Sequence, residues 1–207
     1  MMHAARAWAL TLICLSALLA AGCTTPGRES ASAPAPGERP DQAALEQALV
    51  DYASPGRPHA RLASRAGTWD LDITYWERPD AEPLRTKGTS QVTAIWGGRY
   101  LVEHLKTEFD GEPFSGLGIT GYDNFKDKFV SVWIDCLSTG IMRATGEGES
   151  ATIVYDSESV DFVNRSYKMC RSSERSIDAD TRRIFLYDTD LDGNEFMSFE
   201  IIYRRKK

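Results

Sequence analysis

Residues 68–75 read Thr-Trp-Asp-Leu-Asp-Ile-Thr-Tyr, and this stretch points directly to a class of fold. Apolar Trp69, Leu71 and Ile73 alternate with polar residues. A period of two is typical of a strand with one face buried, because successive side chains of a strand point to opposite faces. The stretch therefore predicts a half-buried β-strand.

Similar short segments follow along the rest of the chain. Turn signals such as Gly97-Gly98 and Asp192-Gly193 separate them. About ten short strands at hairpin spacing, with no long helix between them, predict an all-β fold: an up-and-down antiparallel barrel, whose closure removes exposed edges. After the first strand, we expect strands near 86–96, 99–109, 113–122, 129–135, 140–147, 151–156, 164–176, 182–188 and 195–204. Glycines 116, 118 and 121 lie inside one of these strands and suggest a sharp bend in the barrel wall.

A short helical region precedes the strands. Asp41 can cap a helix that runs to Tyr52, with Leu45 and Leu49 on the same face as Tyr52. A second helical turn is expected near Pro58, and the barrel domain is expected to span 57–207, after a helix and connector at 41–56.

The N-terminus looks like an export signal. Residues 1–22 contain one early cation, Arg6, and then an apolar run that is short for a membrane-spanning helix, which needs about 20 residues. The run ends Leu19-Ala20-Ala21-Gly22-Cys23, which resembles a lipobox. That resemblance implies cleavage before Cys23 and lipidation of its thiol, with an ordinary signal peptide or an uncleaved anchor as the alternatives.

The segment after the cleavage site predicts a tether and an address. Residues 23–40 begin with the lipidated Cys23 and continue in Pro, Ala, Ser and Gly, which have little to bury, so we expect a disordered linker. Processed lipoproteins carry three acyl chains (palmitate is a typical one), enough for stable anchoring. The residue after the lipidated cysteine is Thr24, whereas aspartate at that position is the usual signal for retention in the inner membrane. Thr24 therefore favours the outer membrane, and the predicted location is the periplasmic face of the cell envelope.

Composition restricts the partners of the chain. The chain has 207 residues and a net charge of −6, with acids and bases interspersed, which argues against a nucleic-acid partner because that would need a basic stripe. Residues 204–207 are locally basic and are expected to form a solvated terminus, with membrane phosphates as the alternative partner.

Two cysteines, Cys136 and Cys170, belong to the folded part. Exported domains often oxidise such pairs, but these two fall on strands that are not neighbours in sequence, and a bridge needs Cα atoms within about 7 Å. The sequence leaves open whether they are bonded.

Several motifs occur in a fixed order along the domain. Together they resemble the bacterial domain-of-unknown-function 1579 family, over roughly residues 58–207. The family is similar to calycin barrels such as lipocalins and has no established activity, so the resemblance implies a fold and not a chemistry. The motifs are Gly67-Thr68-Trp69, Trp96-Gly97-Gly98-Arg99-Tyr100, Phe114 with Gly116 and Gly118, Gly121-Tyr122-Asp123, Trp133-Ile134-Asp135, and Asp192-Gly193 leading to Glu200 and Tyr203-Arg204.

A barrel of this size can hold one small apolar ligand, so its interior is the expected binding site. In the segment 100–109 neither strand face is purely apolar, and the sequence does not show which face is inward. Aromatic residues that simply pack the barrel ends are the alternative to a ligand-lining role. The candidate lining residues are Trp69, Trp96, Tyr100, His104, Tyr122, Trp133 and Arg143.

Metal, haem and catalytic sites find little support. Asp188, Asp190 and Asp192 imitate the start of a calcium loop, but Phe199 stands where its bidentate glutamate belongs. A hairpin turn explains these aspartates more simply. His104 is the only histidine on a predicted strand and is a poor basis for haem ligation. No cofactor is expected, and no catalytic motif gives a reason to expect an enzyme.

The sequence leaves three hypotheses for the function. The leading hypothesis is an envelope lipoprotein whose barrel binds or carries a small apolar or amphipathic ligand. The second is an accessory protein with a packed barrel that contacts another protein through Trp76 and the basic C-terminus. The third is a hydrolase or isomerase that uses rim carboxylates, for which Asp123, Asp127 and Asp135 are the candidates.

Overall fold

The computed structural model describes residues 42–148, 151–161 and 164–207. The predicted signal at 1–22, the lipidated Cys23 and the tether at 23–40 lie outside the described residues. Residues 41–207 form one compact unit. In the described part of the chain, no helix combines the length and apolarity needed to cross a membrane.

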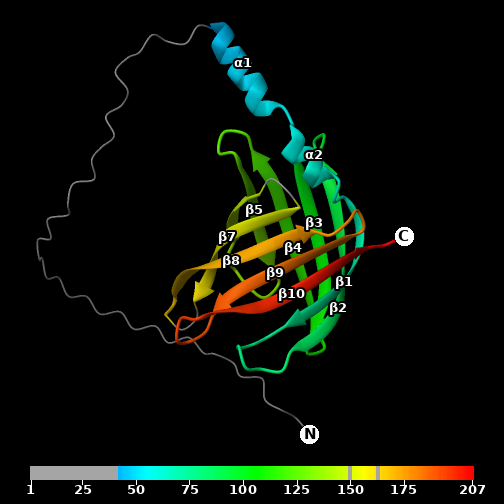
Figure 1. Ribbon diagram of the computed structural model, residues 1–207, viewed down its shortest axis with the longest axis vertical. Helices are drawn as coiled ribbons and strands as arrows, with labels where there is room; N and C mark the ends of the chain where they lie inside the picture. The colour runs from blue at the N-terminus through cyan, green and yellow to red at the C-terminus, as the bar shows by residue number, and fades with distance from the viewer. Residues whose placement is uncertain (1–41, 149–150, 162–163) are drawn as a thin grey trace, which may run out of the picture. The chain divides into compact units, whose positions relative to one another are not determined.

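The described residues contain two short helices followed by ten strands (Figure 1). Each of the ten predicted strands is present, and most begin and end within two residues of the predicted bounds. The elements are α1 (Gln42–Ala53), α2 (Arg57–Ala63), β1 (Gly67–Tyr75), β2 (Leu84–Ile95), β3 (Tyr100–Phe109), β4 (Glu112–Asp123), β5 (Lys128–Asp135), β6 (Met142–Glu147), β7 (Thr152–Asp161), β8 (Ser166–Ser176), β9 (Thr181–Thr189) and β10 (Glu195–Arg205).

The strands form a closed antiparallel barrel, as the sequence predicts. Each strand pairs with its sequence neighbour, and β1 also pairs with β10, for example through Leu71 opposite Tyr203. Closure therefore pairs the first and last strands, which would be the exposed edges of an open sheet. A register shift between Met197 and Phe199 marks a local bulge in β10.

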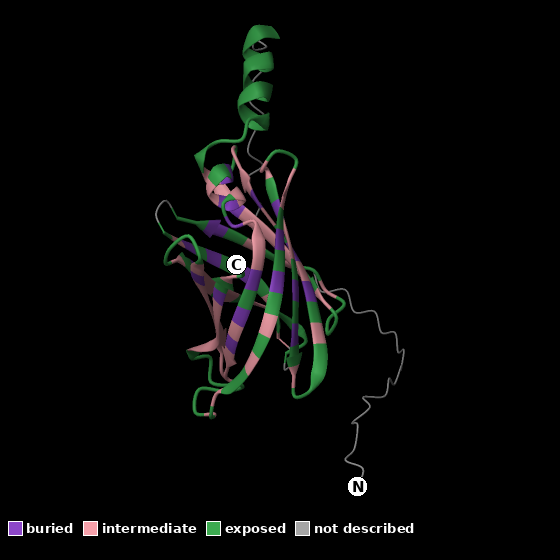
Figure 2. Cartoon of the chain, turned by 90° about the vertical axis from the view of Figure 1, so that its right-hand side faces the viewer, coloured by how far each residue is buried: buried purple, intermediate pink, exposed green. Residues whose placement is uncertain are grey.

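Alternation along the strands separates the barrel interior from solvent (Figure 2). In β1, Trp69, Leu71 and Ile73 are buried, at 2–3% exposure. In β3 the structure settles the question that the sequence left open: Leu101 and Leu105 are buried, whereas His104 on the opposite face is exposed.

Helix α2 closes one end of the barrel. Its own Leu62 is completely buried, and Pro58 occupies its first turn, where the missing N–H costs nothing. The ring of His59 connects the helix to the strands: its Nδ1 accepts a hydrogen bond from the Gly56 N–H at 3.0 Å, and its Nε2 lies 3.1 Å from the Tyr122 carbonyl oxygen. The end of the barrel next to α2 is therefore fixed by both apolar burial and hydrogen bonds.

The glycines of β4 lie beneath aromatic rings of neighbouring strands. None of Gly116, Gly118 and Gly121 has a positive φ. A Cβ at Gly116 would overlap the indole of Trp133, and a Cβ at Gly121 would lie under 3.0 Å from the ring of Tyr100. These glycines therefore make room for neighbouring aromatic rings.

Helix α1 leaves its apolar residues exposed. Leu45, Leu49 and Val50 are each more than half exposed, and no residue of α1 is buried. The end of α1 contacts the barrel through Tyr52, whose ring centroid lies 4.3 Å from that of Phe125.

Candidate functional site

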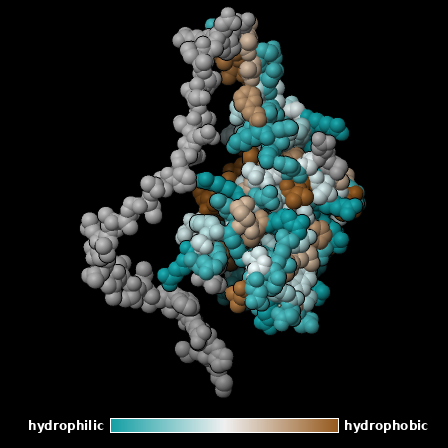
Figure 3. All heavy atoms as spheres, turned by 60° about the vertical axis from the view of Figure 1, so that its left-hand side comes forward, coloured by the Kyte–Doolittle hydropathy of each residue, from teal (hydrophilic) through white to brown (hydrophobic). Residues whose placement is uncertain are grey.

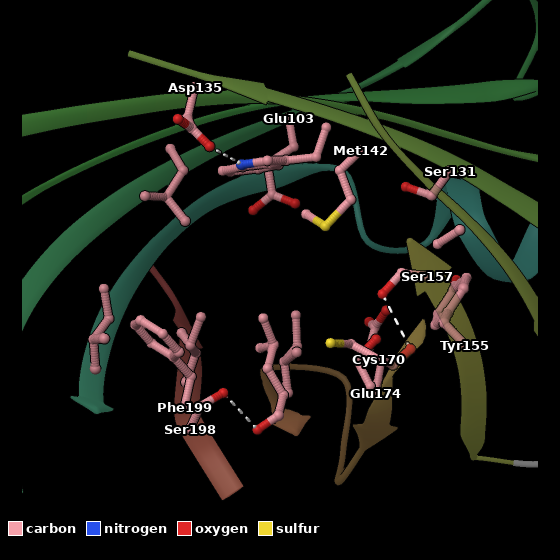
Figure 4. Close-up of a pocket in the computed structure, with 18 of the residues that line it drawn as sticks. Glu103, Ser131, Asp135, Met142, Tyr155, Ser157, Cys170, Glu174, Ser198 and Phe199 are labelled. Atoms are coloured by element: carbon pink, nitrogen blue, oxygen red, sulfur yellow. Dashed lines mark hydrogen bonds between the residues drawn. The ribbon is translucent and has the colours of Figure 1, made fainter. Parts of the chain in front are cut away.

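A cavity with a volume of about 640 Å³ occupies the barrel interior. This volume is within the range of about 300–1,000 Å³ that is common for small-molecule sites. Figure 4 shows Glu103 and Met142 facing Cys170, Glu174 and Phe199 across an open space. The barrel is therefore not solidly packed.

The wall of the cavity is mainly apolar, because the inward positions of most strands carry aliphatic and aromatic side chains. Serine hydroxyls of β7, β8 and β10 interrupt this wall, and Ser157 and Ser198 donate hydrogen bonds to backbone carbonyls. The apolar lining comprises Ile73, Val92, Leu101, Leu105, Phe109, Phe114, Val132, Trp133, Met142, Ala144, Ile184, Leu186, Phe199 and Ile201.

The cavity ends beneath α2 at a cluster of four ionic side chains, Arg65, Glu103, Glu174 and Arg182, which we call the floor cluster. Glu174 accepts hydrogen bonds from Nη1 of Arg65 at 2.8 Å and from Nη1 of Arg182 at 3.1 Å. Glu103 accepts a hydrogen bond from Ser90 at 2.6 Å and lies 3.6 Å from Nη2 of Arg182. The guanidinium of Arg182 also stacks 3.8 Å from the ring centroid of Tyr203.

The floor cluster carries charge although it is buried. Burial acts to raise the pKa of Glu174, but the guanidiniums of Arg65 and Arg182 outweigh it and hold that pKa below its ordinary value. Burial acts in the opposite direction on Arg182, where Glu174 and Glu103 prevail and raise the pKa. Burial raises the pKa values of Tyr155 and Tyr203 beside the cluster, so both hydroxyls keep their protons.

The opposite end of the cavity is open and acidic. Lining residues there include exposed Glu77, Asp110 and Leu137, which lie at the hairpin end away from α2. Asp135 and Asp188 also line this outer end. The cavity is therefore accessible from this end, which is lined by carboxylates.

Strands β8 and β9 separate towards the outer end. Backbone pairing between the two strands extends only from Ser172 to Ser176 of β8. Beyond it, side chains connect the strands: Lys168 lies 2.5 Å from Asp188, and the guanidinium of Arg171 lies 4.3 Å from the ring centroid of Tyr187.

Both cysteines of the barrel are free thiols. Cys136 is exposed after the end of β5, whereas Cys170 lies on β8 and lines the cavity. Strands β6 and β7 stand between them, which explains why the disulfide that the sequence left open is not formed here. Burial raises the pKa of the Cys170 thiol, and Asp188 adds to the effect.

The structure places one of the seven candidate lining residues, Trp133, on the cavity wall. Its Nε1 donates a hydrogen bond to Asp135 at 3.1 Å. Trp69 is buried in the core behind the floor cluster, where its Nε1 donates to the Arg65 carbonyl at 3.0 Å. It therefore packs the barrel end, the alternative that the sequence allowed.

The other five candidates do not line the cavity. Trp96 is 73% exposed, and Tyr100, His104 and Arg143 are also exposed on the outside of the barrel. Tyr122 packs against His59 at the closed end. The error arose because aromatic content identifies strands better than it identifies which face of a strand is inward.

The floor cluster contains the residues that the sequence reading missed. In β9, Arg182 has the same parity as Ile184 and Leu186, so a charge on an otherwise apolar face was a detectable signal. Glu174 follows two serines, so it does not interrupt an apolar strand face, and Arg65 precedes the first strand. Neither position therefore gave a comparable signal.

The residues weighed as weak calcium and catalytic candidates occupy separate places. Asp190 accepts backbone hydrogen bonds from Asp192 and Asn194, which lower its pKa, as expected in a tight turn. No cluster of three His, Cys, Asp or Glu suited to a metal ion is found within 42–148, 151–161 and 164–207. Asp123 and Asp135 lie at opposite ends of the β4–β5 pair, so the carboxylates proposed for a hydrolase do not converge.

The outer surface gives little motive for the accessory-protein hypothesis. On the face in Figure 3, hydrophilic residues predominate and hydrophobic ones are scattered. Trp76 is half-buried, not exposed. Arg204 pairs with Asp72, and the Arg205 guanidinium lies 4.2 Å from the ring centroid of Trp69. The expected solvated terminus is therefore partly structural.

Comparison with known proteins assigns the family. The sequence profile of a protein family of unknown function, DUF1579, matches residues 54–205. The chain belongs to the DUF1579 family. No curated protein sequence matches this DUF1579 protein.

Two solved structures are similar to this DUF1579 protein. Rv2717c from M. tuberculosis is similar at a TM-score of 0.54, with 15% identity over 74% of this chain and 100% of that chain. This likeness concerns the fold alone. A redesigned β-barrel, b11L5F_LGL, has a TM-score of 0.40 and 14% identity over 75% of this chain and 100% of its own, which is too distant to carry an argument.

Proposed function

We propose that this DUF1579 protein binds or carries a small apolar or amphipathic molecule inside its barrel. The observation that carries the proposal is the cavity of about 640 Å³, which is closed beneath α2, open at the other end and lined mainly by aliphatic and aromatic side chains. Transfer of apolar ligand surface from water to such a wall is favourable by about 25 cal/mol per Å².

The proposed setting is the periplasmic face of the cell envelope, with the outer membrane favoured. The argument is the lipobox-like stretch that ends in Cys23, followed by a linker with little to bury. A lipid-tethered barrel next to a bilayer would meet ligands that partition into membranes, which agrees with an apolar cavity.

A thiol in the cavity wall gives a direct test of occupancy. The fragment 41–207 contains every buried core residue, from Leu62 to Tyr203, and with Cys136→Ser it retains Cys170 as its one cysteine. The neutral dye N-phenyl-1-naphthylamine is expected to bind saturably, one per barrel. At about 90% occupancy the rate of maleimide labelling of Cys170 should fall about tenfold, because only the empty fraction reacts. Labelling is followed by mass spectrometry at alkaline pH, since the thiolate is the reactive form.

The matched control is the Cys170→Ser fragment, which retains exposed Cys136. Its labelling rate should not change with dye, although the dye should still bind. Absence of saturable dye binding, or equal slowing of both thiols, contradicts a ligand site inside the barrel.

The anchor is tested separately on the full chain. In a Gram-negative host, the wild-type protein is expected to incorporate labelled palmitate and to sediment with membranes. Cys23→Ser should lose both properties, because the thiol that accepts the lipid is absent. The proposal is wrong if the variant stays in the membrane fraction or keeps the label.

A further inference from the structure

The floor cluster holds more hydrogen-bond donors than acceptors. In the part of the chain that the structure describes, Nε and Nη2 of both Arg65 and Arg182 lack a hydrogen-bond partner. Both arginines line the cavity, and they are 6% and 5% exposed. Buried charged donors without acceptors are costly, so four such nitrogen atoms at the end of one cavity need an explanation.

Charge at the closed end is also unbalanced. Arg61 acts electrostatically on Arg65 and Glu174, and its Nη2 is likewise buried and unpartnered among the described residues. Counting Arg61, which bonds to the Gly148 carbonyl and acts on the cluster from outside the cavity wall, three guanidiniums surround two carboxylates, those of Glu103 and Glu174. One negative charge would balance the set.

The outer end has the opposite sign. Glu77, Asp110, Asp135 and Asp188 line it. Lys168 offsets Asp188 there, whereas Glu77 and Asp110 are exposed. An anionic head group is therefore repelled at the outer end and attracted at the floor.

We infer that the floor cluster binds the carboxylate of a single-chain monocarboxylate, inserted head first, with its hydrocarbon chain along the apolar wall. The guanidinium fork matches the two oxygens of a carboxylate, and a single charge meets the excess of the three guanidiniums of Arg61, Arg65 and Arg182 over the two carboxylates. The hydroxyls of Ser157 and Ser198 on the wall are bonded to backbone carbonyls, and the mainly apolar wall is left to the chain. This inference rests on the proposed function and adds the ligand's head group and orientation.

Three probes with the same chain test the head group: dodecanoate, 1-dodecanol and dodecylammonium. Each displaces N-phenyl-1-naphthylamine from the wild-type fragment 41–207 at concentrations below micelle formation. Dodecanoate should compete at a concentration at least about tenfold lower than dodecanol, because charge-assisted hydrogen bonds form only with the acid. Competition by dodecylammonium should not depend on Arg65, because its charge is attracted by the carboxylates of the outer end and not by the floor. Equal competition by dodecanoate and dodecanol overturns the inference but leaves dye binding, and with it the proposed function, intact.

Two arginine variants locate the effect. Arg65→Gln should reduce the preference for dodecanoate over dodecanol about tenfold, while Glu174 keeps its bond to Arg182. Unchanged dodecanol binding shows that the variant has folded. Arg183→Gln removes the same charge from the next position of β9, where the side chain pairs with Glu200, and should preserve the preference. A preference that survives in Arg65→Gln, or is lost equally in Arg183→Gln, overturns the assignment to the floor.

Discussion

Replacement of Glu174 by Gln is expected to destabilise the barrel by about 3–5 kcal/mol at neutral pH, because loss of one partner leaves buried charges without compensation. Glu174 is 6% exposed and accepts hydrogen bonds from both Arg65 and Arg182. A neutral amide offers them one acceptor and no charge. The free energy of unfolding, measured by urea denaturation of the fragment 41–207, checks this value.

The pH dependence of this difference follows from the pKa of Glu174. That pKa is lower in the folded state than its ordinary value of about 4.3, so the carboxylate stabilises the fold fully above that value. Its contribution is lost as the pH falls through the lower, folded-state pKa. The difference between wild type and Glu174→Gln should therefore be constant above about pH 5 and shrink below about pH 4.

A surface carboxylate provides the control for Glu174. Glu147 pairs with Lys128 at 2.8 Å, but its side chain is 71% exposed. Glu147→Gln should therefore cost no more than about 1 kcal/mol. A loss from Glu174→Gln as small as that of the control, or one that does not change down to pH 3, would show that the floor cluster does not carry the charges described.

Trp69→Ala is the second large effect, with an expected loss of about 3–5 kcal/mol, because it removes the largest fully buried side chain of the core. The indole donates to the Arg65 carbonyl, and Arg205 lies 4.2 Å from its ring centroid. The substitution leaves a cavity and an unpaired carbonyl acceptor. Urea denaturation followed by circular dichroism measures the loss.

Trp133→Ala is the matched comparison for Trp69. Its indole is half-buried and faces the cavity, so the stability loss should stay below about 2 kcal/mol. Dye binding should change instead, since part of the cavity wall is gone. Equal stability losses for the two variants would contradict the division into a core tryptophan and a lining tryptophan.

The sequence predicted the positions of the β-strands well, but it predicted less well which face of each strand points into the barrel. Alternation in β1 identified Trp69, Leu71 and Ile73 as buried, because all inward positions there are apolar. In β3, inward Glu103 interrupts the apolar series. Its hydrogen-bond partner Ser90 and its ionic partner Arg182 come from β2 and β9. No local pattern in β3 reports on partners that distant.

The candidate site shows the same division. The barrel interior was the expected binding site because a barrel of about ten strands has room for a ligand, but the sequence left open whether a cavity exists. Its lining was predicted mainly from aromatic residues, of which Trp133 alone lies on the wall. Trp96 and Tyr100 lie near the turn between β2 and β3, where side chains project outward into solvent.

By itself, the sequence determined the period-two strands, their turns and hence a closed antiparallel barrel, because these depend on neighbours within a few residues. The tertiary structure alone decided that the barrel is hollow and that its floor carries Arg65, Glu174 and Arg182. These three residues are separated by up to 117 positions, and their charges become costly or useful only when closure of the barrel removes water from around all of them together.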